Sequence, residues 1–146
     1  MKLSNTLYPF LFGLIGIFAF SPFSIKFLIF ISYIYLIKVI LYKERNSLTK
    51  LFCWGLGHWG FGMSWLIVSI YYYGETHILG ASLIFMFLII LLSIVFTCPI
   101  YLIRKLSKFA LFNNIITKTF YVSSFILLIE LTKYHFLNGV PWLIPG

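Results

Sequence analysis

Long blocks of apolar residues run through this chain, and short polar or charged segments separate them. Each block has roughly the 17 to 25 residues that a helix needs to cross a hydrocarbon core about 30 Å thick. Helices are expected throughout, because lipid offers no hydrogen-bond partners to an open backbone. The pattern therefore predicts an all-α membrane protein with five transmembrane helices, at residues 3–20, 23–42, 51–73, 78–103 and 119–137.

The first predicted helix has two interpretations. Because Lys2 precedes an apolar run, the segment is similar to a cleavable signal peptide. The residues around Ala19, however, lack the small pair that a cleavage site needs, so we expect a retained helix. Pro22 has no amide hydrogen and restricts the residue before it, which predicts a turn at Ser21-Pro22 between the first two helices.

Basic residues gather at alternate ends of the predicted helices and so indicate an orientation. A cytoplasmic amino terminus places nine of the 11 lysines and arginines on or near the inner side, namely Lys2, Lys38, Lys43, Arg45, Lys50, Arg104, Lys105, Lys108 and Lys118. Only Lys26 and Lys133 then fall outside. Cytoplasmic loops of membrane proteins carry such an excess. We expect a multi-pass membrane protein whose carboxyl terminus faces the periplasm.

Composition agrees with a lipid environment. The 146 residues are 62% hydrophobic and 10% charged, whereas ordinary soluble domains carry roughly 25% charged residues. The formal charge of +8 is not arranged as a nucleic-acid interface, because the basic residues cluster between apolar blocks and do not line one exposed face. We therefore expect no nucleic acid among the partners.

Few residues carry recognisable chemistry. Cys53 and Cys98 lie inside or at the end of apolar blocks, where a thiol behaves as a small hydrophobe and forms little thiolate. The histidines, His58, His77 and His135, have no metal-ligand spacing, and the chain has only three acids. We expect no metal, no cofactor and no catalytic residue within this chain.

The third predicted helix combines an aromatic stripe with glycines. Six of its side chains recur at intervals of three or four residues and share one face of a helix: Trp54, His58, Phe61, Trp65, Ser69 and Tyr72. Gly55 and Gly62 share another side, and Gly57 and Gly60 project nearly opposite to it, so this helix is expected to pack between two neighbours. The stripe either anchors the helix at the membrane interface or lines a cavity for a lipid.

Glu130 is an acid inside an apolar run of the last predicted helix. Insertion scales put an acid at a helix centre at about +2.5 to +3.5 kcal/mol, so a partner is expected. Lys133 and Tyr134 lie three and four residues further on and reach the same face. The pair Glu130 and Lys133 is either a local ion pair near the headgroups or part of a site.

Four segments, in order, resemble the apolipoprotein N-acyltransferase family. Residues 18–23 (FAFSPF) are similar to the family's L-A-F-S-P-[FY], and residues 52–70 (FCWGLGHWGFGMSWLIVSI) resemble its third span nearly throughout. Residues 130–133 (ELTK) stand where the family usually has E-x-x-R-G, and residues 138–143 (NGVPWL) are similar to its T-G-F-P-W-L. The resemblance thus covers nearly the whole chain.

The resemblance implies an eight-helix membrane domain with a nitrilase-like domain inserted before the last helix. A Glu-Lys-Cys triad in that domain takes an acyl chain from a phospholipid and passes it to the amino group of a lipoprotein's terminal diacylglyceryl-cysteine. No residue of this chain matches the triad, so residues 1–146 are expected to be a truncated membrane domain without activity of its own. Lys133 replaces the family's arginine and cannot supply its planar fork.

The residues expected to bind lipid or shape the motif are Trp65, Ser69, Glu130, Lys133, Pro141 and Trp142. Of these, Trp142 and its loop match a family segment beside the acyl-donor site. The expected partners are a membrane phospholipid and either the apolipoprotein or a separately encoded catalytic domain. Three alternatives stay open: a truncated or split gene product, a fragment of a longer chain, and a non-catalytic membrane scaffold or transporter subunit.

Overall fold

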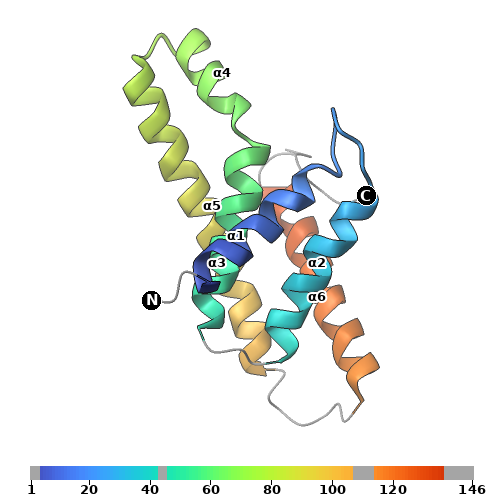
Figure 1. The fold of residues 1–146 in the computed structure, drawn as a ribbon. Helices are drawn as coiled ribbons and strands as arrows, with labels where there is room; N and C mark the ends of the chain where they lie inside the picture. The colour runs from blue at the N-terminus through green and yellow to red at the C-terminus, as the bar shows by residue number, and fades with distance from the viewer. Residues whose placement is uncertain (1–3, 43–45, 107–113, 137–146) are drawn as a thin grey trace.

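A computed structural model describes residues 4–42, 46–106 and 114–136 of the chain, and the side chains of Ser4, Arg104 to Leu106, Lys133, Tyr134 and Phe136 lie outside that description. The described residues form helices and no strands, which confirms the all-α prediction (Figure 1). In chain order the helices are α1 (Ser4–Ile17), α2 (Phe27–Leu41), α3 (Ser47–Gly62), α4 (Trp65–Tyr73), α5 (Ile78–Leu106) and α6 (Ile115–Phe136).

The helices differ in their capacity to cross a bilayer. By length and apolar composition, the segments Ile78–Ile103 of α5 and Ile115–Thr132 of α6 are each sufficient. The bent pair α3 and α4 makes a third span if both are counted as one. Apolar helices Asn5–Ile17 and Phe27–Leu41 are shorter than that criterion requires. The number of five spans and their orientation therefore stay predictions.

The first two helices are shorter than the predicted segments 3–20 and 23–42. After Ile17 the backbone tightens, because the amide of Phe20 bonds to the carbonyl of Ile17 at 3.0 Å in a three-residue turn. Ser24 then adopts a left-handed backbone, with φ of 54°, before α2 begins. Apolar residues thus continue through a turn that hydropathy alone does not reveal.

The predicted third helix, residues 51–73, is wrong as a single straight element. α3 ends at Gly62, α4 begins at Trp65, and the two axes differ by 54°. Around the break the backbone uses three-residue hydrogen bonds, from Ser64 to Phe61 at 3.2 Å and from Leu66 to Met63 at 2.9 Å. Glycine is about 1 kcal/mol less favourable than alanine inside a helix, so Gly62 is a weak point at which the helix stops.

α3 is the central helix, and α1 and α5 both pack against it (Figure 1). A Cβ atom added at Gly57 would overlap the carbonyl oxygen of Phe10 in α1, and one at Gly55 would lie 3.1 Å from the side chain of Ser93 in α5. The prediction that glycines place this helix between two neighbours is confirmed by these contacts. Gly60, by contrast, faces Ile89 of α5 and does not share the α1 side with Gly57.

The ends of the helices fall into two groups in Figure 1. α2 and α5 end, and α3 and α6 begin, at the lower end of the view, whereas the α4–α5 connection lies at the opposite end. Basic residues therefore occur in the last turn of α2 and the first turns of α3 and α6, all at one end. This grouping agrees with the predicted orientation, which itself stays a prediction.

Candidate functional site

Several polar side chains are buried inside this apolar bundle, and they are the starting point for a site. Within the described part of the chain, the buried polar residues are Ser32, Ser47, His58, Ser93, Thr97 and Glu130. Burying a polar group without a hydrogen bond is costly, so each of them requires a local explanation. Two groups of contacts provide such explanations, and both involve α2. The first includes Trp54 of α3, and the second includes Glu130 of α6.

Trp54 organises the first group. Its indole Nε1 donates a hydrogen bond to Ser32 Oγ on α2 at 3.1 Å. Its ring stacks on His58, with centroids 4.8 Å apart, and on Phe96 of α5, with centroids 5.3 Å apart. Trp54 is 1% exposed. A tryptophan buried this deeply uses its ring for packing and its polar edge for one specific partner.

His58 continues the same group toward α1. Its Nδ1 lies 3.4 Å from the carbonyl oxygen of Gly13. Because a carbonyl oxygen only accepts, a hydrogen bond between the two atoms requires the histidine tautomer that carries its proton on Nδ1. Two glycines of α1 make room for these side chains. A Cβ at Gly16 would lie 2.7 Å from Ser32 Oγ, and one at Gly13 would overlap the carbonyl oxygen of Trp54. Glycine at both positions is therefore a condition for the close contact of α1, α2 and α3.

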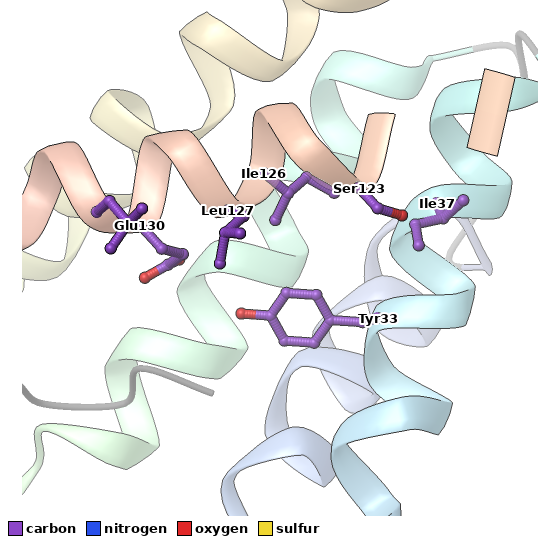
Figure 2. A pocket seen from close by; sticks show the side chains of 7 residues that line it. Tyr33, Ile37, Ser123, Ile126, Leu127 and Glu130 are labelled. Atoms are coloured by element: carbon purple, nitrogen blue, oxygen red, sulfur yellow. The ribbon is translucent and has the colours of Figure 1, made fainter. Parts of the chain in front are cut away.

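A cavity of about 240 Å³ lies between α2 and α6. It is lined by Tyr33, Ile37, Ser123, Ile126, Leu127, Glu130 and Leu131. Figure 2 shows the Tyr33 hydroxyl and the Glu130 carboxyl turned into the same space, one from each helix. The remaining walls are mostly aliphatic, so the cavity presents two polar groups in apolar surroundings.

Tyr33 connects this cavity to the Trp54 group. Its ring meets Trp54 edge to face, with centroids 5.5 Å apart, and this contact fixes the direction of the side chain. The hydroxyl oxygen is buried and has no hydrogen-bond partner among the described residues. A tyrosine hydroxyl in such a position is available to a ligand.

Glu130 is 2% exposed and lines the cavity at its polar end. An ionisable side chain buried in a membrane helix is costly and by default marks a functional site. The predicted partner Lys133 belongs to α6, but its side chain lies outside the described residues. Pro141 and Trp142 lie outside them as well.

The structure separates the other two predicted site residues from this cavity. Trp65 and Ser69 belong to α4, which packs against α5. Trp65 is 43% exposed, and neither residue lines the cavity beside Glu130. Their proposed role in lipid binding therefore has to be argued separately from that of Glu130.

The aromatic stripe of the sequence is divided by the bend. Trp54 and His58 are buried in α3, whereas Phe61, Trp65 and Tyr72 are exposed. A single interface for all six side chains is therefore wrong. Phe61 is already exposed within α3, and Trp65, Ser69 and Tyr72 lie beyond the 54° change of direction. The lipid-cavity interpretation of the stripe does not hold as one surface.

Sequence reasoning missed Ser32 and Tyr33. Both lie inside the second apolar block, where a small hydroxyl and an aromatic residue look like ordinary filling. One weak signal was available, namely that the two polar residues are adjacent. Adjacent residues point to different sides of a helix, so Ser32 and Tyr33 need polar contacts on two different sides of the helix. The structure supplies them as Trp54 for Ser32 and the α2–α6 cavity for Tyr33.

Within the described residues, His, Cys, Asp and Glu side chains do not gather in a group of three or more that would hold a metal. Cys53 is half-buried on α3 and Cys98 is exposed on α5, both as free thiols. A second cavity of about 400 Å³, lined by residues of α1, α3 and α5 such as Leu14, Gly60 and Ile89, is almost wholly apolar. The α2–α6 cavity is thus the better candidate for polar recognition.

Comparison with known proteins decides the family. The family model described as the apolipoprotein N-acyltransferase N-terminal domain matches residues 12–146. The chain belongs to the apolipoprotein N-acyltransferase family. No solved structure matches it.

Curated relatives of the family come from several bacteria. The chain is 31% identical over 137 residues to the apolipoprotein N-acyltransferase of Pasteurella multocida, a match that covers 92% of this chain and 24% of the relative. It is 43% identical over 72 residues to that of Haemophilus influenzae, covering 49% of this chain and 13% of the relative. For Haemophilus ducreyi the identity is 30% over 141 residues, covering 92% and 25%. The chain therefore spans about a quarter of the length of the relatives that it matches over most of its own length.

Proposed function

We propose that this chain is the membrane part of an apolipoprotein N-acyltransferase, the enzyme that moves an acyl chain from a phospholipid to the N-terminal diacylglyceryl-cysteine of bacterial lipoproteins. The observation that carries the proposal is the family match over residues 12–146. The apolar helices of the bundle fit a protein that works in lipid. The role of this part is to hold lipid and to position the catalytic part, since the chemistry belongs to the family's nitrilase-like domain.

The proposed location is the bacterial inner membrane, with several spans and a cytoplasmic amino terminus. The uneven distribution of lysine and arginine supports this orientation. So does the grouping of the basic helix ends at one end of the bundle (Figure 1). The opposite end, with the α4–α5 connection, then faces the periplasm, where the lipoprotein substrate is expected.

For lipid binding we propose two separate regions. Glu130 belongs to the α2–α6 cavity, with Lys133 one turn further along α6. Trp65 and Ser69 belong to α4, whose exposed aromatic side chains suit the boundary between acyl chains and headgroups. The segment with Pro141 and Trp142 is proposed to complete the lipid site by its resemblance to the family motif.

The proposed partners are a membrane phospholipid and either the apolipoprotein or the family's catalytic domain. By itself the chain is proposed to be inactive. Covalent acyl transfer needs a nucleophile with a base in hydrogen-bond reach. Among the described residues neither Cys53 nor Cys98 makes a hydrogen bond to such a base.

The test is a reconstitution in phospholipid vesicles with a synthetic diacylglyceryl-cysteine peptide. We expect N-acylated peptide when the chain is combined with the catalytic part of a curated relative, and none with either component alone. Mass spectrometry of the peptide reads the result. If the combination yields no more N-acylated peptide than the catalytic part alone, the proposal is wrong.

A further inference from the structure

The α2–α6 cavity has a polar end and an end that is mostly apolar. Glu130 and Tyr33 define the polar end, whereas Ile37 and Ile126 lie toward the other end, where the hydroxyl of Ser123 is the remaining polar group (Figure 2). Such a gradient is complementary to a molecule that carries one polar group on a hydrocarbon body. The polar end decides which group that is.

The polar end offers acceptors and an aromatic face. A carboxylate has about four acceptor positions, so the side chain of Glu130 can accept several hydrogen bonds at once. The buried hydroxyl of Tyr33 has no partner among the described residues and adds a further acceptor. The ring of Tyr33 adds a surface that attracts cations. Carboxylate, phenol oxygen and ring together favour a cation with several donors and disfavour phosphate or a second carboxylate.

We propose that the polar end of this cavity binds the primary ammonium group of a lipid, whose hydrocarbon part lies along Ile37 and Ile126. Two sources carry this chemistry, the headgroup of an aminophospholipid and the free amino terminus of a lipid-modified peptide. The proposal rests on the proposed function for its biological meaning, because an N-acyltransferase has to accept an amine. It assigns to Tyr33 and Glu130 the recognition of that amine, not its acylation.

The depth of the site is compatible with this ligand. Glu130 precedes the end of α6 at Phe136 by six residues, and Tyr33 follows the start of α2 at Phe27 by six residues, about 9 Å along each helix. The 15 residues of α2 span only about 22 Å, less than the roughly 30 Å of a hydrocarbon core. A bilayer thins beside a helix that is too short for it, and this brings headgroups closer to the cavity.

The first experiment measures lipid retention by the purified chain. The chain is equilibrated in vesicles that contain equal amounts of phosphatidylethanolamine and its N-acetylated form, with identical acyl chains, and the retained lipids are counted by native mass spectrometry. We expect the free amine to be enriched about tenfold, the order of a hydrogen bond to a charged group. Glu130→Gln should abolish the enrichment, and Tyr33→Phe should lower it several-fold.

Matched controls separate recognition from folding. Glu75→Gln and Tyr8→Phe change an exposed acid and an exposed tyrosine outside both proposed lipid-binding regions and should leave the enrichment intact. Ile37→Phe leaves both polar groups in place but fills the cavity, and it should also remove the enrichment. Enrichment that survives Glu130→Gln in a folded protein, or no preference in the unmodified chain, would overturn the proposal.

The second experiment identifies the source of the amine. A diacylglyceryl-cysteine peptide with a free amino terminus, and the same peptide N-acetylated, compete for the retained phosphatidylethanolamine. Displacement by the free peptide alone assigns the site to the lipid-modified peptide, and displacement by neither assigns it to the aminophospholipid. Displacement by both forms alike would contradict amine recognition. The acyl-transfer assay described under Proposed function is a separate measurement. If acyl transfer occurs but the chain shows no preference for lipids with a free amine, this inference is wrong and the proposed function is unaffected.

Discussion

Trp54 and His58, one turn apart on α3, stack with their ring centroids 4.8 Å apart and their planes within 10° of parallel. Each ring also reaches another helix, Trp54 through Ser32 of α2 and His58 through the carbonyl oxygen of Gly13 in α1. The stack thus joins three helices at one point. In lipid the hydrophobic effect does not hold helices together, so packing and such hydrogen bonds have to do so.

Ser32→Ala removes the hydroxyl that accepts from Trp54 Nε1 and leaves the ring stack in place. Hydrogen bonds between membrane helices contribute about 0.6 kcal/mol on average and about 1.7 at most. We expect the free energy of unfolding in detergent to fall by an amount in this range. Ser82→Ala is the matched control, because that hydroxyl bonds to the Ile78 carbonyl of its own helix. Equal effects of both changes would contradict an interhelical role.

Gly57→Ala should destabilise the contact between α1 and α3. The added Cβ would overlap the carbonyl oxygen of Phe10, a backbone atom that a side-chain rotation cannot move. Overpacking of this kind costs about 1 to 3 kcal/mol. Gly80→Ala is the control, since its nearest neighbour is a side-chain atom 4.0 Å away. Unfolding measurements on both variants test the difference, and a neutral or stabilising Gly57→Ala would show that the helices cross elsewhere.

Apolar composition was sufficient to predict the all-α class and to place α5 and most of α6. These helices are long, and their hydropathy is continuous, so no other element fits the pattern. The glycines of α3 also predicted a helix with two close neighbours. The reason is physical, since a residue without a side chain is useful where two backbones approach.

The bend after Gly62 and the site residue Tyr33 could not be predicted in the same way. Glycine serves both close packing and helix termination, and the sequence does not say which use applies. Hydropathy treats Tyr33 as one more aromatic residue of α2. Its importance comes from Glu130, 97 positions away in the chain, whose side chain α6 brings to the same cavity. Long-range juxtapositions of this kind leave no periodic trace.

Gly62→Ala should narrow the bend between α3 and α4. Alanine is more favourable than glycine inside a helix by about 1 kcal/mol. The substitution should therefore stabilise a continuous, straighter helix relative to the observed 54° bend. Spin labels at Leu48→Cys and Tyr72→Cys, in a chain with Cys53 and Cys98 replaced by serine, report the distance across the break. We expect that distance to increase relative to the glycine-containing parent.

The control for the bend is Gly80→Ala in the same labelled chain, because Gly80 lies on α5, away from the break. It should leave the distance unchanged. An identical distance distribution for Gly62→Ala and its parent would mean that packing of α4 on α5, and not the glycine, holds the bend.

Reagent access tests the orientation. In a chain without native cysteines, Glu75→Cys lies between α4 and α5, and Lys118→Cys lies in the first turn of α6, at the opposite end. A membrane-impermeant maleimide added to spheroplasts should label Glu75→Cys and reach Lys118→Cys only after the membrane is permeabilised. Labelling of Lys118→Cys in intact spheroplasts would reverse the proposed topology.

The double substitution Cys53→Ser and Cys98→Ser should change neither the lipids that the chain retains nor its acyl content. The two thiols lie on different helices, α3 and α5, and neither makes a hydrogen bond to a base among the described residues. A thiol without such a base is a poor nucleophile toward a phospholipid ester, because attack requires the thiolate. After incubation with labelled phospholipid, we expect no label that hydroxylamine releases from the unmodified chain. A hydroxylamine-sensitive acyl group that the double variant lacks would show that one of these cysteines is an acceptor, and the chain would then need a base supplied from outside its described helices.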